Sequence, residues 1–301
     1  MTSAVAAIDV GGTLLKGGHV DPEGNLTHSV RAPTGREAGP DAAVAAILDF
    51  AAELVAAGPV TAVGVAVPGV VDEVTGTAVF SANIGWRDVP FRRLLAERTG
   101  LPVWFGQDVR AGALAEGRSG AGEGATDFLF MPIGTGIGGA MVLGGVAYPG
   151  AAGLAGEIGH IVVRPGGRPC GCGHAGCLET YASAAAVSAR YAELSGERVG
   201  AEEVVARAVT GEANAEAVWT GAIEALADGL HTYVTLLNPA LVVIGGGLAL
   251  AGDALFAPLA AALAARLTFQ RAPRLAPALL GDRAGCLGAG LAAWTLVKGT
   301  R

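Results

Sequence analysis

The chain has 301 residues, of which 27 are acidic and 20 are basic, so its formal net charge is −7. A general nucleic-acid-binding protein needs a basic face against the phosphates, and this charge balance argues against such a partner. With 51% hydrophobic and only 16% charged residues, the chain is not intrinsically disordered, and its length suggests two domains that each bury a core.

The first third of the chain predicts an antiparallel meander followed by a helix and a buried strand. Gly11-Gly12-Thr13 and the turn residues at 21–25 separate three apolar stretches. A helical apolar periodicity then ends at Gly58-Pro59, and a continuously apolar run follows, as in parallel sheets. The predicted strands are 5–10, 14–20, 26–32 and 60–67, and the predicted helix is 41–57.

The second half begins with the same pattern. The apolar run 128–133 meets Gly134-Thr135-Gly136, and residues 138–143 can return as a second strand. Two units of strand, glycine-threonine loop and strand, about 125 residues apart, suggest a duplicated α/β architecture with two lobes. The elements predicted after them are helices at 182–194 and 213–237, a strand at 241–244, and a final helix from about 288.

The chain shows no sign of a membrane or secreted location. The long uncharged runs 128–156 and 232–252 are cut by prolines and glycine clusters, so neither predicts a transmembrane helix. No basic region followed by an apolar stretch precedes Asp9, and four cysteines with three of them clustered are not a secreted disulfide framework. We therefore expect a reducing, cytoplasmic location.

Three glycine clusters, at 9–18, 133–140 and 242–249, are candidates for phosphate and nucleotide binding. A strand that ends in glycines leaves backbone N–H groups free for phosphate oxygens, and the Asp9 carboxylate can hold Mg²⁺. An ordinary hairpin turn or tight connection is the alternative for each. The candidate ATP and phosphate residues are Asp9, Gly11, Gly12, Thr13, Lys16, Gly134, Thr135, Gly136, Gly245, Gly246 and Gly247.

The most specific chemical signal is a loop with Cys170, Cys172 and Cys177. Three thiolates in a glycine-rich loop can converge, and one histidine would complete a closed, structural Zn²⁺ site. Spacing alone favours His174, with His160 as the rival. The alternative is three buried thiols without a metal, whereas the isolated Cys286 is expected to be a small core residue.

Asp108 follows the predicted strand 101–105 and precedes an alanine-rich helix. It can be the N-cap of that helix, or a general base that meets a substrate hydroxyl at the junction of the lobes. The residues by themselves leave both roles open.

Taken together, these motifs resemble the ROK family of bacterial sugar kinases, close to its glucokinase branch. The resemblance runs from end to end through the glycine-threonine loop at 9–13, AVPGVVD at 66–72, ANIGW at 82–86, IGTGIGGA at 133–140, GEIGH at 156–160, CGCGHAGCLE at 170–179 and IGGGLA at 244–249. It implies an α/β, actin-like or hexokinase-like (ribonuclease H-like) duplicated two-domain fold with an interdomain cleft. It further implies transfer of the γ-phosphate of ATP, bound with Mg²⁺, to the 6-hydroxyl of a hexose.

The resemblance also implies roles for single residues. Asp108 matches the catalytic base, and Cys170, Cys172 and Cys177 match structural zinc ligands. For the fourth ligand the family implies His160 and not His174, and we follow the family. The positions that match sugar-binding residues are Asn83, Gln107, Asp108, Glu157, His160 and Glu179.

One departure from the family concerns the sugar. The family usually has Asn directly before the catalytic Asp, and this chain has Gln107. The extra methylene moves the amide by about 1.5 Å, enough to lose or redirect a hydroxyl contact. Glucose is therefore the expected substrate, with N-acetylglucosamine, N-acetylmannosamine or another hexose as alternatives.

The expected domains are a smaller lobe, 1–110, completed by a C-terminal helix at about 286–301, and a larger lobe, 111–285, that carries the zinc loop 160–179. The resemblance implies a homodimer or homotetramer.

A sugar-responsive transcriptional regulator is a competing hypothesis, but residues before Asp9 leave no room for a helix-turn-helix. The third hypothesis is an actin-like scaffold without sugar chemistry, and the carboxylates beside the zinc loop argue against it.

Overall fold

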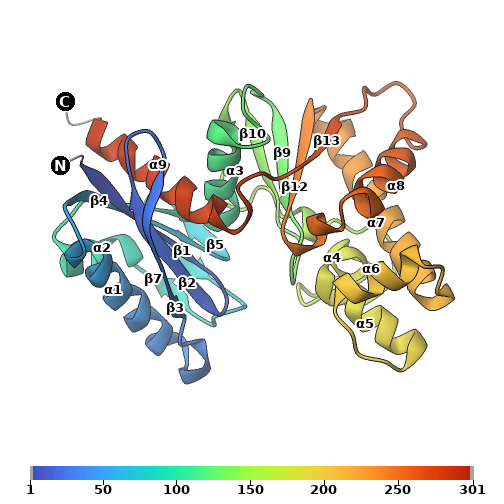
Figure 1. Cartoon of the computed structure of the whole chain (residues 1–301), viewed down its shortest axis with the longest axis horizontal. Helices are drawn as coiled ribbons and strands as arrows, with labels where there is room; N and C mark the ends of the chain where they lie inside the picture. Colours follow the sequence, from blue (N-terminus) through green and yellow to red (C-terminus); the bar gives the residue numbers. More distant parts are fainter. Residues whose placement is uncertain (1–2, 299–301) are drawn as a thin grey trace. The chain divides into compact units, whose positions relative to one another are not determined.

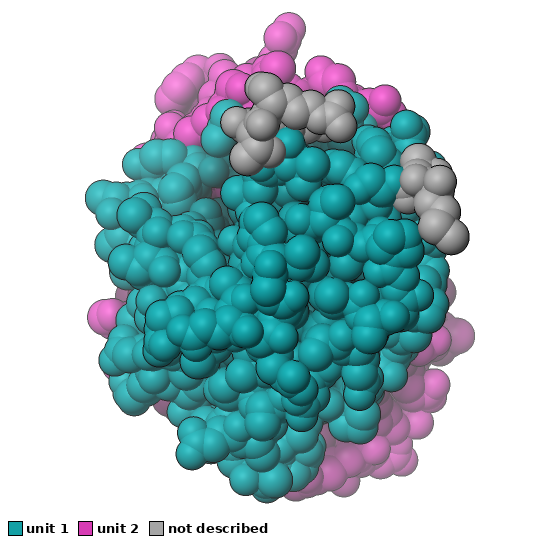
Figure 2. Space-filling model, turned by 90° about the vertical axis from the view of Figure 1, so that its left-hand side faces the viewer, with its two compact units in different colours: residues 1–120, 146–155, 282–301 teal, residues 121–145, 156–281 magenta. Residues whose placement is uncertain are grey.

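The computed structural model describes residues 3–298, so the end of the predicted last helix, 299–301, lies outside the described residues. The chain forms two compact units, which Figure 2 colours separately. Unit 1 comprises residues 1–120, 146–155 and 282–301, and unit 2 comprises 121–145 and 156–281. No helix among the described residues is long and apolar enough to cross a membrane.

Unit 1 is built on a five-stranded sheet with the order β3-β2-β1-β4-β8. The meander predicted for its first three strands is confirmed, since β1 pairs antiparallel with β2 and β2 with β3. β4 and β8 extend the sheet in parallel. The strands are β1 (Ala4–Val10), β2 (Leu14–Val20), β3 (Leu26–Pro33), β4 (Val60–Val67) and β8 (Val103–Gln107).

Alternating side chains of β4 divide the helices of unit 1 between the two faces of the sheet. Val65 packs in the same apolar cluster as Ile47 of α1 (Pro40–Ala56). The helix α2 (Phe91–Thr99) packs against β8. The adjacent Ala66 instead packs with Ala111 of α3 (Asp108–Ser119) and Ala289 of α9 (Ala284–Lys298), the red helix of Figure 1. This alternation is the period of two that a strand imposes.

Glycine allows α9 to lie very close to α3. A Cβ built on Gly288 would lie 1.8 Å from the backbone oxygen of Ala111, so no larger residue fits there.

The smaller elements of unit 1 are η1 (Arg36–Ala38), β5 (Val70–Asp72), β6 (Thr77–Phe80), β7 (Arg87–Val89) and β11 (Val146–Ala147). The strands β5, β6 and β7 form a small antiparallel sheet.

Unit 2 repeats the strand pattern of unit 1. Its first strand, β9 (Phe128–Pro132), pairs antiparallel with β10 (Ala140–Leu143) and parallel with β12 (Leu241–Gly245), and β13 (Arg274–Pro277) follows in parallel. β1 has the same two kinds of neighbour, β2 antiparallel and β4 parallel. The duplication expected from the two glycine-threonine loops is therefore present in the topology.

Helices of unit 2 share one apolar cluster with its sheet. The 25-residue α7 (Ala213–Leu237) is central, because Leu226 and Leu230 are fully buried beside Val242 and Ile244 of β12. The helix predicted at 182–194 is present as α5 (Ala184–Ser195), which begins two residues later because Ser183 is its N-cap and accepts from Ala186 N. The remaining elements of unit 2 are η2 (Ile158–His160), α4 (Glu179–Ala182), α6 (Ala201–Val209), η3 (Gly247–Ala251) and α8 (Asp253–Ala264). The short η4 (Gly281–Arg283) begins at the last residue of unit 2 and continues into unit 1.

The unit boundaries differ from the expected lobes. The sequence placed a junction near 110, but all of α3 belongs to unit 1 because it packs against α9. Residues 146–155 also belong to unit 1, which the local pattern gave no reason to expect.

Candidate functional site

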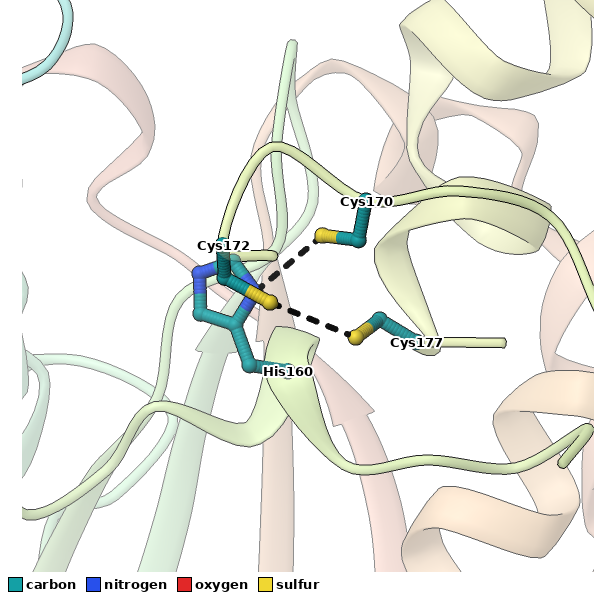
Figure 3. A group of neighbouring side chains, drawn as sticks. All are labelled: His160, Cys170, Cys172 and Cys177. Atoms are coloured by element: carbon teal, nitrogen blue, oxygen red, sulfur yellow. Dashed lines mark hydrogen bonds between the residues drawn. The ribbon is translucent and has the colours of Figure 1, made fainter. Parts of the chain in front are cut away.

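The thiol loop brings four potential metal ligands together in unit 2. His160 comes from η2, and Cys170, Cys172 and Cys177 come from the loop that precedes α4 (Figure 3). One ligand atom from each residue lies within 4.8 Å of the others. Two contacts define the group: Cys170 Sγ lies 3.5 Å from His160 Nδ1, and Cys172 Sγ lies 3.6 Å from Cys177 Sγ.

These distances fit a tetrahedral Zn²⁺ site. With Zn–S bonds of about 2.3 Å and a Zn–N bond of about 2.0 Å, tetrahedral geometry requires ligand atoms about 3.5–3.8 Å apart. Within the described residues, the group contains His160 and not His174. His174 is exposed, and its backbone oxygen accepts a hydrogen bond from Cys170 N at 2.8 Å. The residues present therefore fit zinc with His160 as the fourth ligand.

Burial changes the acidity of the thiols. It raises the pKa of Cys170 to about 12 and also raises the pKa of Cys177, since a thiolate is costly away from water. A backbone hydrogen bond from His174 lowers the pKa of the exposed Cys172. A divalent cation would supply the positive charge that thiolates at the two buried positions require.

Two carboxylates lie against the histidine of this group. Glu179 Oε1 is 3.5 Å from His160 Nδ1 and 3.4 Å from Cys170 Sγ, whereas Glu157 Oε2 is 4.0 Å from His160 Nε2. A Cβ built on Gly136 would lie 3.0 Å from Glu179 Oε2. The structure thus gathers Glu157, His160 and Glu179, three of the predicted sugar-binding residues, and places Glu179 beside the second glycine loop.

The second and third glycine clusters are neighbours in unit 2. They follow the adjacent parallel strands β9 and β12, and Ile133 exchanges backbone hydrogen bonds with Gly245 and Leu248. Gly246 has a φ of 75°, and a Cβ there would lie 2.3 Å from Ile133 O. Only glycine allows this approach, which joins the loops 134–136 and 245–247 into one glycine-rich surface.

The first glycine loop, at the end of β1 in unit 1, carries the most perturbed carboxylate of the predicted phosphate site. Burial raises the pKa of Asp9 to about 6, although the ammonium of Lys16, 3.8 Å away, opposes the rise. Lys16 Nζ also donates to Asp282 O at 3.2 Å. A buried carboxylate beside a single ammonium is suited to a cation such as the Mg²⁺ that accompanies ATP.

Asp108 is the first residue of α3, and the expected N-cap role belongs instead to Gln107. Gln107 has extended backbone angles, and its side-chain oxygen accepts from Arg110 N at 2.8 Å. Asp108 Oδ1 accepts from Val109 N at 2.8 Å. The N-cap prediction for Asp108 is therefore wrong by one residue. The carboxylate still lies at the positive end of a helix dipole, which favours its ionised form.

Comparison with known proteins covers nearly the whole chain. The model of the ROK family matches residues 5–296. The chain belongs to the ROK family. It is 34% identical to a glucokinase from Halalkalibacterium halodurans, over 94% of this chain and 92% of that protein. It is also 37% identical to a kanosamine kinase from Amycolatopsis mediterranei, over 77% of this chain and 76% of that one.

A solved ROK structure shares the fold. The crystal structure of a ROK glucokinase from Streptomyces griseus in complex with glucose and AMPPNP superposes with a TM-score of 0.85 at 30% identity. It covers 97% of this chain and 99% of that one. The actin-like fold expected from the ROK resemblance is therefore confirmed.

Sequence reasoning missed a buried ion pair next to Asp108 in this ROK protein. Arg110 Nε donates to Glu73 Oε1 at 2.8 Å, and Arg110 Nη1 donates to Gly153 O at 3.1 Å. The Arg110 side chain is only 6% exposed, and within residues 3–298 its Nη2 is buried without a hydrogen-bond partner. A buried arginine early in an alanine-rich helix has no local partner, because Glu73 and Gly153 lie 37 and 43 residues away in the sequence.

Proposed function

We propose that this protein is an ATP-dependent hexokinase that transfers the γ-phosphoryl group of ATP to the 6-hydroxyl of glucose. The observation that carries the proposal is Asp108 at the start of α3, directly after a parallel strand, in a chain that aligns over 97% of its length with an enzyme crystallised with glucose and AMPPNP. Ligands of α/β proteins bind where parallel strands end, so a substrate hydroxyl can meet this carboxylate.

In the proposed reaction Asp108 orients the hydroxyl and receives its proton. The helix dipole keeps the carboxylate ionised and weakly basic, so the proton is accepted late, when the oxygen–phosphorus bond has largely formed. Phosphoryl transfer depends mainly on positioning and charge stabilisation. We assign the phosphates to the three glycine loops, and we assign the Mg²⁺ that accompanies ATP to Asp9.

Glu157, His160 and Glu179 are proposed to bind sugar hydroxyls, together with Asn83 and Gln107 of unit 1. His160 is suited to this because one ring nitrogen faces the thiols and the other lies 4.0 Å from Glu157. Zinc held by His160 and the three cysteines would order the loop and fix the orientation of this imidazole.

We also propose a cytoplasmic location, because the cytoplasm keeps thiols reduced and supplies ATP.

The identity of the hexose rests on Gln107. Its side-chain oxygen accepts from Arg110 N, which orients the side chain, and its NH₂ group can donate to a sugar hydroxyl. Every hydroxyl oxygen of glucose can accept from such a donor, whereas the ammonium of an amino sugar cannot accept at the position that bears it. We therefore propose glucose as the substrate over kanosamine, the sugar in the name of the relative that is 37% identical, with the amino position facing Gln107.

A sugar panel in a coupled assay of ADP release tests the proposal. We expect the highest kcat/KM with glucose, and about 10³-fold or more lower kcat for Asp108→Asn with the sugar KM changed by less than about threefold. Asp41→Asn, an acidic residue in the first turn of α1, is the matched control and should retain wild-type turnover.

Two results would contradict the proposal. Near-normal turnover of Asp108→Asn would remove this carboxylate from the mechanism. A preference of wild type for an N-acetylated or amino hexose over glucose would keep the kinase and replace the substrate.

A further inference from the structure

Arg36, just beyond the end of β3, is held against the first glycine loop of unit 1. The fully buried Thr34 binds this loop twice: its backbone N–H donates to Thr13 O at 2.9 Å, and its hydroxyl donates to Gly11 O at 2.9 Å. Gly35 follows with a φ of 75°, and the chain turns into η1. The position of Arg36 is thus fixed by two hydrogen bonds and a turn.

The guanidinium of Arg36 lies between the phosphate loop and a predicted sugar-binding segment. A Cβ built on Gly12 would lie 3.5 Å from Arg36 Nη1, so the charged group borders the open face of this glycine. The same Nη1 donates to Asn83 O at 3.4 Å. One cation therefore touches both the loop assigned to phosphates and the segment assigned to the sugar.

The surroundings leave this charge available to an anion. The nearest carboxylate is Glu37 Oε1, 3.7 Å from Arg36 Nε, and the two side chains are 39% and 75% exposed. Exposed pairs of this kind contribute little stability and are readily exchanged for a better partner. A phosphoryl group is such a partner, because the planar guanidinium can donate two parallel hydrogen bonds to its oxygens.

We propose that Arg36 binds the phosphoryl group during its transfer and then the phosphate of the sugar phosphate product. This inference rests on the proposed function and adds a cationic phosphoryl site to it. In the reaction, the bond between the γ-phosphorus and the bridging oxygen of ATP breaks, and the bond from the sugar oxygen to the phosphorus forms. The hydroxyl proton goes to Asp108, while Arg36 stays protonated and stabilises negative charge on the non-bridging oxygens.

Arg36→Met and Arg36→Lys test this role, with Arg93→Met as the matched control. Arg93 of α2 pairs with Glu97 at 3.0 Å, and its side chain is 64% exposed. We expect Arg36→Met to lower kcat by about 100-fold or more with the sugar KM within about threefold, because the interaction forms at the phosphoryl group. Arg36→Lys should recover part of the loss, and Arg93→Met should match wild type.

Calorimetric binding of glucose and of glucose 6-phosphate gives an independent readout. Arg36→Met should bind glucose as wild type does and glucose 6-phosphate at least about 10-fold more weakly. An unchanged kcat with unchanged affinity for the sugar phosphate would overturn the inference. So would a raised sugar KM at unchanged kcat, since Arg36 would then only hold the backbone at Asn83.

The two proposals fail in different ways. A wild-type protein that phosphorylates no hexose would contradict the proposed function. The titration of wild type and Arg36→Met with glucose 6-phosphate tests the role of Arg36 whether or not the protein turns over a hexose. If the wild type turns over glucose and Arg36→Met does so equally well, only the inference falls.

Discussion

The region around Asp108 and the thiol loop are stabilised by different means. At the start of α3, the protein itself supplies opposite charges and backbone partners: Gln107 caps the helix, and Arg110 joins Glu73 to Gly153. In the thiol loop, three sulfur atoms and one imidazole nitrogen lie within 4.8 Å of one another, and two of the pairs are 3.5 and 3.6 Å apart. The first site is organised by contacts within the protein, whereas the residues of the second fit a metal ion that would hold them together.

Removal of zinc is the largest expected effect and would sharpen this contrast. Cys177→Ser, or treatment with a strong chelator, should lower the zinc content from about one per chain and raise the sugar KM by about 10- to 100-fold. Elemental analysis and the coupled assay measure both quantities. Cys286→Ala, the buried thiol of unit 1, should keep its zinc. A zinc-free protein with unchanged sugar affinity would show that the thiol loop needs no metal.

Loss of the ion pair tests the self-organised region. Arg110→Met should lower the free energy of unfolding by about 3 kcal/mol, because the largely buried guanidinium is the partner of Glu73 and Gly153. The double variant with Glu73→Gln should be less destabilised than the single changes add up to. Urea unfolding measures all three variants. Strict additivity would mean that the two groups do not stabilise one another.

Asp9→Asn should stabilise the ligand-free protein while it weakens the binding of Mg·ATP. Burial raises the pKa of Asp9 to about 6, so the ionised carboxylate is disfavoured in the fold at neutral pH. The wild type has the full stability contribution of this group below pH 3.8 and loses it as the pH rises to about 6. The gain from Asn should grow over that window to about 1–3 kcal/mol. Thermal melts across this pH range, with Asp41→Asn as control, measure the gain. An unchanged or lower stability of Asp9→Asn would contradict the prediction.

The smallest expected effect concerns Asp228 of α7, which Arg266 and Arg164 bind. Burial alone would raise the pKa of Asp228, but these hydrogen bonds hold it below the ordinary 3.8. Its stabilising contribution is therefore present above that pH and is lost as the pH falls through the lowered pKa. Asp228→Asn should cost about 1 kcal/mol at pH 7, and this cost should shrink as the pH falls below 3.8. A difference between the melts of the two proteins that stays constant over this pH range would refute the assignment.

The sequence predicted the features of the fold that are encoded locally. Apolar runs and glycine loops mark the strands β1 to β4, β8 to β10 and β12, and the structure confirms these strands. The strand β13, the short helix α4 and the small sheet of β5, β6 and β7 were missed, because elements this short carry little periodicity.

Site residues were harder to predict where contacts are distant in the sequence. Spacing favoured His174 because it stands inside the cysteine motif, but its backbone closes the turn at Cys170 and its side chain is exposed. His160 reaches the thiols through η2, ten residues before Cys170. Arg36 and Arg110 contact residues that only tertiary folding brings near, so no local pattern could identify these contacts.

The contact of α9 with the sheet of unit 1 has a consequence for synthesis on the ribosome. β1, β4 and α3 are made within the first 119 residues, yet the helix that covers one face of them spans Ala284–Lys298. Unit 2 has its last strand by Pro277. The half of the protein that is translated first is thus the last to be completed, and the nascent chain carries an uncovered apolar surface through most of its elongation.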